Sequence, residues 1–383
     1  MDINFHYFAV KTIAMEAGFS MGEAQQIATY SQYVDDFDWL AYRNCQNIPK
    51  YITADKASDL YLPPSLKLKS NFNPNTTGFG TVSMVTLLLE SSQKSIVSPF
   101  HFVPPKKTDK ISKDSRTVPA KVGDGSLMSD RLVAAREKLA QGEESRRASL
   151  MRIGMMLHTF ADSYAHQRFS GYNSWVNDVE IVSVKNNINR KDMTKDVLEQ
   201  IGESERKCRK DAARSANKNI TGSARSLLPC IGHMWAGDTP DRSNLSFRMK
   251  YREDKSDKKY NREYVRNNTR TFLNASRQIL DYLRSCKAQG PISNADWGTF
   301  AEKLQKGFLV EYPTRNTASV LAAHWKKIFP KIQYNYDTKE VEEKFYTGGS
   351  GNFLSKYYTK AFYRHNYIAN ATLIDMYGRW PRG

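Results

Sequence analysis

The chain has 383 residues, 40% of them hydrophobic, and a formal net charge of +17 at pH 7. This size and apolar content fit one large globular domain or two ordinary ones, and they exclude a disordered chain. The four cysteines are widely spaced, which argues against a zinc finger or a disulfide-built scaffold, and the absence of a run of about 18 apolar residues argues against a membrane span.

The start of the chain and its positive charge bear on localisation and partners. Residues 1–6 lack the basic and apolar stretches of a cleavable signal peptide, so we expect the protein to be cytoplasmic or exported by a dedicated secretion route. The excess charge is gathered in local clusters that favour phosphates, either of an anionic membrane surface or of nucleic acid. Solvated faces that aid solubility are the alternative for each cluster. The clusters lie at 106–107, 146–147, 206–210 and 255–259.

Residues 2–44 predict two helices. Apolar residues at helical spacing run through 5–14, and Gly18 is a typical C-terminal stop. Ser20 followed by Glu23 has the spacing of a capping box, which predicts the start of the second helix.

These two helices carry the first candidate metal ligands. His6 lies on the first helix, and Asp35 and Asp36 lie at the end of the second. Two carboxylates at a helix C-terminus oppose the helix dipole, so a nearby cation would favour them. An exposed acidic cap is the alternative interpretation.

Loops and helix alternate in the next segments. Residues 63–80 are rich in Pro, Asn, Lys and Gly and predict a loop, whereas the apolar run 82–89 predicts a helix. Prolines on both sides of His101 predict extended backbone over 98–105, which would hold this imidazole rigidly between two phenylalanines. Such a histidine suits a metal ligand, and simple packing is the alternative. Residues 104–125 are basic and contain Pro, which predicts an exposed loop.

A helix is expected over about 143–168, and it organises the candidate site. His158, Asp162 and His166 recur at every fourth residue, so they share one face of a helix that is otherwise mostly apolar. Burying two imidazoles and a carboxylate is costly unless something offsets it, and metal ions do that well. The motif spans about 12 Å, too long for one ion held by bonds of about 2 Å, so it predicts two ions with Asp162 near both. Core histidines satisfied by hydrogen bonds are the alternative.

The second half of the chain contributes one more cluster. Residues 172–225 are polar with weak helical periodicity, and we interpret them as an inserted arm. His233 lies among small and apolar residues, and Asp238 and Asp241 follow it in a turn rich in Gly and Pro. The charged segment 242–262 is expected to be exposed.

Helices are expected again over about 263–287 and 294–328, before an aromatic-rich tail. The fold expected from these elements is all-α: a multi-helix bundle with inserted loops over residues 1–290, and a helical C-terminal extension, 291–383, packed on it. The two remaining histidines, which we assign to packing or to the surface, are His324 and His365.

The order of these elements resembles the all-helical zinc-dependent phospholipase C superfamily, which also includes single-strand-specific nucleases. Gly154, His158, Asp162 and His166 match the pattern Gly-x-x-x-His-x-x-x-Asp-x-x-x-His of its phospholipase branch. Residues 98–101, Ser-Pro-Phe-His, are similar to the Ser-Pro-Leu-His ligand segment of the nuclease branch. The resemblance covers about residues 3–242. The opening of the chain and residues 157–166 also resemble an uncharacterised bacterial family.

The resemblance implies a centre of two or three Zn²⁺ ions. One ion would be bound by Asp35 or Asp36 together with His101, His158 and Asp162. A second would be bound by His166, His233 and either Asp238 or Asp241. His6 would support a third ion near Asp162, and a carboxylate of the Asp35–Asp36 pair would serve as general base.

From this resemblance we expect a zinc-dependent phosphoric diester hydrolase, phospholipase C-like, that uses its ions to activate water. Export as an antibacterial effector, with an immunity protein as partner, would reconcile lipid hydrolysis with the missing signal peptide. One alternative is a single-strand nuclease with the same ions. Another is a non-catalytic interaction or toxin module with a structural metal.

Overall fold

A computed structural model of the chain describes most of its first 337 residues. The described ranges are 1–37, 77–78, 90–105, 112–142, 145–216, 230–257, 259–312 and 317–337, with short stretches at 345–346, 356–357, 368–369, 371–372 and 376.

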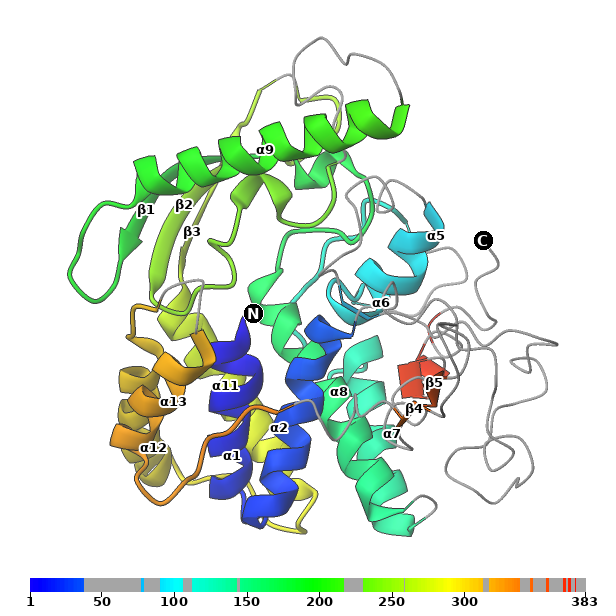
Figure 1. The fold of residues 1–383 in the computed structure, drawn as a ribbon, viewed down its shortest axis with the longest axis vertical. Coiled ribbons are helices and arrows are strands. Elements are labelled where there is room, and N and C mark those ends of the chain that lie inside the picture. Colours follow the sequence, from blue (N-terminus) through cyan, green and yellow to red (C-terminus); the bar gives the residue numbers. More distant parts are fainter. Residues whose placement is uncertain are drawn as a thin grey trace, which may run out of the picture.

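A layer of helices forms the lower part of the molecule in Figure 1. Its central helix, α8, packs against α2, α7 and α11. The helices of this layer are the π-helical η1 (Asn4–Ala9), α1 (Val10–Glu16), α2 (Met21–Asp36), α7 (Leu127–Gln141), α8 (Arg146–Ala165) and α11 (Asn268–Ser285). The predicted signals are present at the first two: Gly18 has a left-handed φ of 87° after α1, and Ser20 and Glu23 form a capping box at α2.

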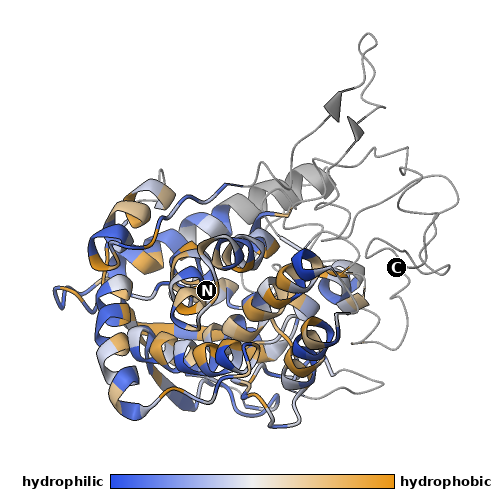
Figure 2. Ribbon diagram, turned by 90° about the horizontal axis from the view of Figure 1, so that it is seen from below, coloured by the Kyte–Doolittle hydropathy of each residue, from blue (hydrophilic) through white to orange (hydrophobic). Residues whose placement is uncertain are grey.

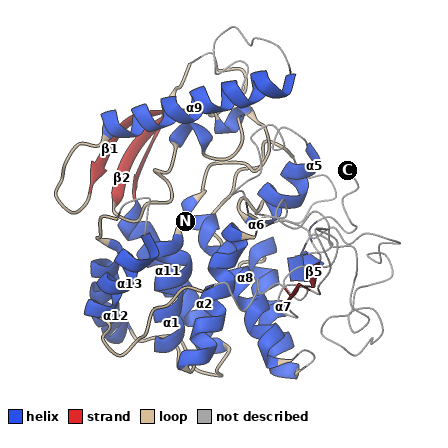
Figure 3. Cartoon of the chain, in the orientation of Figure 1, coloured by secondary structure: helices blue, strands red, loops and turns tan. Residues whose placement is uncertain are grey.

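The prediction of an all-α fold is wrong, because an antiparallel sheet lies above the helices (Figure 3). Its order is β1 (Val179–Asn186), β2 (Leu245–Tyr251) and β3 (Arg262–Asn267), so the fold is mixed α and β. The segment expected to be exposed contains β2, in which buried and less buried residues alternate. Residues 245–251, Leu-Ser-Phe-Arg-Met-Lys-Tyr, alternate apolar and polar side chains with the period of two of a half-buried strand, and the high overall charge of 242–262 misled the prediction.

The region interpreted as an inserted arm contains β1 and α9 (Thr194–Ala216), which runs across the strands (Figure 1). Val197 and Ile201 of α9 belong to the same hydrophobic cluster as Phe247 and Met249 of β2. The helix expected over 263–287 is also corrected, since its first residues form β3.

A short helical stretch precedes His101, where extended backbone was expected. It comprises α5 (Glu90–Ser92), the π-helical η4 (Gln93–Val97) and α6 (Ser98–Phe100). Pro99 lies near the C-terminal end of this continuous helical stretch, where its fixed φ is compatible with helical backbone, and the stretch ends at Phe100. The helix predicted over 82–89 lies outside the described residues.

The C-terminal elements lie against the start of the chain. α12 (Asn294–Phe308) and α13 (Thr317–Ile328) both contact η1, and the ring of Phe308 stacks on that of Phe5. The remaining elements are η5 (Trp175–Asn177), η6 (Met234–Ala236), and the pair β4 (Phe345–Tyr346) and β5 (Lys356–Tyr357). None of the helices that the structure describes has the length and apolar character that a membrane crossing requires.

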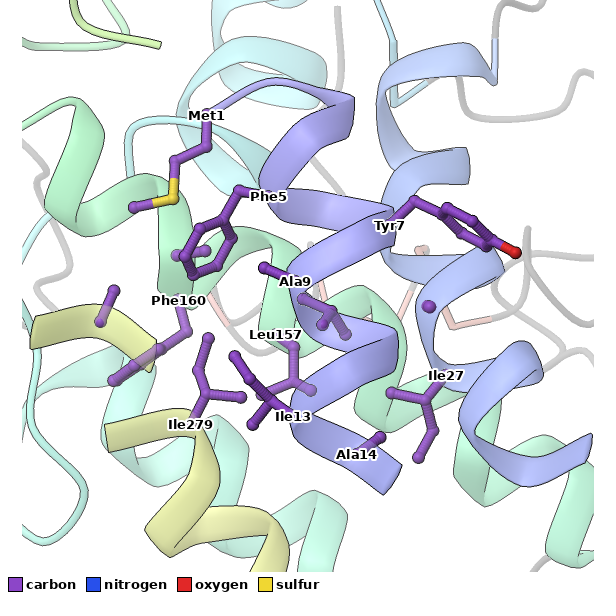
Figure 4. Packing of buried hydrophobic residues seen from close by; sticks show 14 of the residues in the cluster. Met1, Phe5, Tyr7, Ala9, Ile13, Ala14, Ile27, Leu157, Phe160 and Ile279 are labelled. Atoms are coloured by element: carbon purple, nitrogen blue, oxygen red, sulfur yellow. The ribbon is translucent and has the colours of Figure 1, made fainter. Parts of the chain in front are cut away.

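Hydrophobic residues, orange in Figure 2, lie mainly where the helices face one another, and hydrophilic stretches lie outside. Figure 4 shows this core from close by, with Ile13 of α1, Leu157 of α8 and Ile279 of α11 in one cluster. Helices α2 and α8 approach closely at Gly154, where an added Cβ would lie 2.4 Å from the carbonyl oxygen of Ile27.

Replacement of Gly154 by alanine is therefore expected to push α8 away from α2 and to destabilise the fold by about 1–3 kcal/mol. Gly22 offers a matched control, because a Cβ on this α2 residue meets nothing within 4 Å, and Gly22→Ala should not destabilise. Urea unfolding of both variants measures the difference, and equal stabilities would contradict the close packing.

Residues 333–336, here called the strap, cross α1 and α2 and are held by Lys11. Its ammonium donates to Gln25 Oε1 and to the carbonyl of Gln333, and the side chain is 2% exposed. Burial lowers the pKa of Lys11 to about 8.

This shift predicts a pH dependence of the free energy of unfolding. Between pH 8 and 10.5 the folded chain has released the Lys11 proton and the unfolded chain has not, so stability rises with pH. Relative to Lys11→Met, the native protein should gain on the order of 3 kcal/mol across this window. Parallel stability curves for the two proteins, measured by urea unfolding from pH 7 to 10.5, would refute the shift.

Candidate metal centre

Helix α8 supplies three side chains to the centre. His158 and Asp162 lie in its last turns, and His166 is its C-cap residue. Their exposed fractions are 0%, 1% and 4%, so all three are buried. Five other residues from four distant segments meet this face: His6 of η1, Asp35 of α2, His101 after α6, and His233 and Asp241 around η6.

Four donor atoms form the first group, around Asp162 Oδ2. His101 Nδ1, His158 Nε2 and this oxygen lie 3.2–3.3 Å from one another. Asp35 Oδ1 lies 3.7 Å from His101 Nδ1 and 3.6 Å from His158 Nε2. A tetrahedron built on Zn–N and Zn–O bonds of about 2.0–2.1 Å has edges of about 3.3 Å. The five measured edges therefore fit one tetrahedral ion.

Backbone carbonyls select which ring nitrogen of three histidines faces the centre. His101 Nε2 donates to the carbonyl of Thr77 at 2.6 Å, His166 Nδ1 to that of His101 at 2.6 Å, and His233 Nδ1 to that of Gly237 at 2.8 Å. A carbonyl can accept but not donate, so these nitrogens carry the hydrogens. In a neutral ring the other nitrogen then offers a lone pair, as metal-binding histidines do.

Lone pairs facing carboxylate oxygens repel unless a cation or a proton lies between them. His101 Nδ1 faces both Asp162 and Asp35 in this way. The donor set of two imidazoles and two carboxylates, of which only Asp35 is partly exposed, thus fits a divalent cation such as Zn²⁺.

The second group joins His166, His233 and Asp241. His166 Nε2 lies 3.0 Å from Asp241 Oδ1, and His233 Nε2 lies 3.0 Å from Asp241 Oδ2. The ring of Phe102 stacks on His166 at 4.3 Å. A Cβ at Gly232 would lie 2.4 Å from the Phe102 ring, so glycine is required there for His233 to reach this place.

Asp162 Oδ1 and the amino group of Met1 connect the two groups. The amino group lies 2.5 Å from Asp162 Oδ1 and 3.1 Å from Asp241 Oδ1. His6 Nε2 lies 3.1 Å from the same Asp162 oxygen. Burial lowers the pKa of the amino group, but the carboxylates of Asp162, Asp241 and Asp35 outweigh it and raise this pKa to about 11.

The histidines of α8 and η1 are neutral at neutral pH. Burial and then the Met1 ammonium lower the pKa of His6 to about 4, and burial also lowers the pKa values of His158 and His166. Burial opposes ionisation of Asp162, but its interactions with the surrounding imidazoles, that of His166 first, and with the Met1 ammonium hold its pKa well below the usual range. Neutral imidazoles beside an ionised carboxylate are the protonation states that metal binding requires.

Two carboxylates named as alternatives lie outside both groups. Asp36 accepts from the hydroxyl of Tyr336 on the strap, and Asp238 accepts from Gln200 Nε2 at 2.7 Å. Neither belongs to a group of ligand atoms in the described structure, whereas Asp35 and Asp241 do. His324 is bonded through Nε2 to the carbonyl of Lys306 on the helical surface, and His365 lies outside the described residues.

Three supporting groups escaped the sequence analysis. The carbonyl of Thr77 and the amino group of Met1 belong to the main chain, so no residue pattern reveals them. Arg266 of β3 is 4% exposed and donates to the carbonyls of Ala165 at the end of α8 and Pro240 before Asp241. A buried arginine in a charged segment has no local signature either.

Comparisons with known proteins and protein families give one match. Neither a curated protein nor a solved structure matches it. One family model, described as a family of unknown function (DUF6765), matches residues 1–372, nearly the whole chain. The chain therefore belongs to the DUF6765 family.

Proposed function

We propose that this protein is a metal-dependent phosphodiester hydrolase, phospholipase C-like, with a centre of two or three Zn²⁺ ions. The observation that supports it best is the near-tetrahedral arrangement of donor atoms from Asp35, His101, His158 and Asp162. Three histidines each donate one ring N–H to a backbone carbonyl, as metal-binding histidines commonly do, and this supports the same interpretation.

Each group would hold one ion, and His6 with Asp162 would support another between them. When bound, such ions supply Lewis-acid chemistry: they neutralise a phosphodiester and make water more acidic. Asp35 is 30% exposed, against 1% for Asp162, so its carboxylate is open to solvent and to substrate. Burial and then Asp162 raise the pKa of Asp35 well above its usual value in the metal-free protein, so a bound cation would be needed to keep this carboxylate ionised and able to accept a proton from water.

The substrate is proposed to be a phospholipid, approached at an anionic membrane surface that attracts the net charge of +17. A single-strand nuclease with the same ions is the alternative, because the charge suits nucleic acid equally well. Export as an effector with an immunity partner is compatible with either substrate.

The first test is a metal count on the untreated protein by mass spectrometry. Two or three equivalents of zinc are expected, and a metal-free protein would end the proposal. Release of phosphorylated head groups from liposomes, abolished by chelator, supports a phospholipase, whereas chelator-sensitive degradation of single-stranded DNA or RNA supports the nuclease.

Variants separate catalysis from a structural role. His158→Ala should remove activity, and the matched control His324→Ala, a histidine on α13, should not. A His158→Ala protein that melts at a lower temperature but keeps its biological effect would favour a non-catalytic module with a structural metal.

A further inference from the structure

A cavity of about 560 Å³ lies beside the metal centre, between α9, the end of β1 and the residues after α12. Its wall includes Asp238, Thr239 and Arg242, which belong to the same loop as the candidate ligand Asp241. Tyr312 lies beside Arg242 in this wall, and its hydroxyl donates to Asp2, next to Met1. A volume of this size is typical of small-ligand sites.

Pairs of amides and carboxylates form the rim of the cavity. Gln200 Nε2 donates to Asp238 Oδ2 at 2.7 Å, and Asn189 Nδ2 donates to Glu311 Oε1 at 3.4 Å. Each pair places hydrogen-bond donors directly beside acceptors. A hydroxyl group both donates and accepts, so such pairs suit neighbouring hydroxyls of one ligand.

Two buried polar atoms on the wall have no hydrogen-bond partner among the described residues. They are Thr239 Oγ1 and Asn244 Oδ1, in side chains that are 1% and 3% exposed. Each of these atoms exposes less than 1 Å², so it is closed to a ligand in the cavity, and a buried water is the partner that such atoms would take. The side chains of Met193, Val197 and Leu245 add an apolar surface to the same wall.

The charges of the lining argue against an anion. Two positive residues face three negative ones, a net charge of −1, in a protein whose total is +17. The positive residues are Lys191 and Arg242, and the negative ones are Asp196, Asp238 and Glu311.

The aromatic content argues against a quaternary ammonium or a nucleobase. Tyr312 is the aromatic residue among the lining residues, and the guanidinium of Arg242 lies 4.7 Å from its ring centre. The Arg242 guanidinium therefore already covers the face of the Tyr312 ring on which an ammonium group or a nucleobase would stack.

We propose that this cavity binds an uncharged, polyhydroxylated head group, a sugar or polyol, of the phosphodiester substrate. Hydroxyls would meet the amide–carboxylate rim, and the C–H face of the ring would lie on Met193, Val197 and Leu245. The inference rests on the proposed function, because it assigns the substrate class of that same centre.

Binding can be tested by saturation-transfer NMR on the intact protein with three free probes: myo-inositol, choline and uridine. Binding of myo-inositol is expected, and Gln200→Ala and Asn189→Ala should each weaken it by roughly fivefold to tenfold, the effect of one lost hydrogen bond. Both side chains are exposed at the rim, so these variants should fold. Asn274→Ala, at an exposed site on α11, is the control and should bind normally.

Binding of choline or uridine instead of myo-inositol would overturn the inference, as would unchanged myo-inositol binding in both rim variants. A protein that holds zinc and cleaves phosphodiesters, but gives no myo-inositol signal, would overturn this inference and leave the proposed function standing. A chelator-treated sample should still bind myo-inositol, because the rim contains no residue of the metal groups.

Discussion

Replacing Asp162 with asparagine is expected to abolish metal binding at the first group and to weaken it throughout the centre. The two carboxylate oxygens serve different neighbours: Oδ1 lies beside His6 and the Met1 amino group, and Oδ2 beside His101 and His158. An amide keeps the shape of the side chain but removes the charge that offsets a buried cation.

Mutation of a residue that only orients a metal ligand typically lowers metal affinity or activity by about 10–100-fold. Asp162 is itself a proposed ligand, so activity should fall by more than about 100-fold. The thermal shift distinguishes loss of metal from general damage. Zinc added at 1,000 times its Kd should stabilise the chelator-treated native protein by about 4 kcal/mol and should leave Asp162→Asn unchanged.

Asp178→Asn provides the control for Asp162. Asp178 also accepts hydrogen bonds, from Arg252 and Tyr260, but lies outside the ligand groups. This variant should keep the full metal count and the zinc-dependent shift. If zinc stabilised Asp162→Asn as much as the native protein, Asp162 would not be a ligand.

Replacing Arg266 with methionine should have the second largest effect. The guanidinium donates to the carbonyls of Tyr164, Ala165 and Pro240 and to the side chain of Asn268. Burial lowers its pKa to about 10, so it remains a cation at neutral pH and complements the C-terminal dipole of α8. Without it, three buried carbonyls lose their donor, at a cost of roughly 3–5 kcal/mol.

The same substitution should act selectively on the second metal group. Arg266 connects the end of α8, which carries His166, to the loop that carries Asp241. We therefore expect Arg266→Met to lose one equivalent of metal and to retain that held by His101 and His158. Arg248→Met on β2 is the control, since Arg248 is 46% exposed and should change stability by less than about 0.5 kcal/mol. An unchanged metal count in Arg266→Met would show that Arg266 supports the fold alone.

The local sequence predicted correctly those features that depend on a single helix. The capping box at Ser20, the stop at Gly18 and the spacing of His158, Asp162 and His166 each depend on residues within one or two turns. The sequence could not decide which of the two consecutive carboxylates, Asp35 or Asp36, faces the metal centre. Consecutive helical residues point about 100° apart, and the rotation of α2 against α8 placed Asp35 toward His158 and Asp36 toward Tyr336.

The sequence by itself determined α1, α2 and α8, the cap of α2 and the residue types suited to a metal. Those features arise from hydrogen bonds and side-chain spacing within a single segment. Tertiary structure alone decided the pairing of the sheet, because α9 separates β1 from β2 in the chain and the register of β1 shifts between Ile181 and Ser183. It also decided that Asp241 rather than Asp238 meets His233, since Arg266 and Asn268 hold that loop through its carbonyls, which carry no sequence signature.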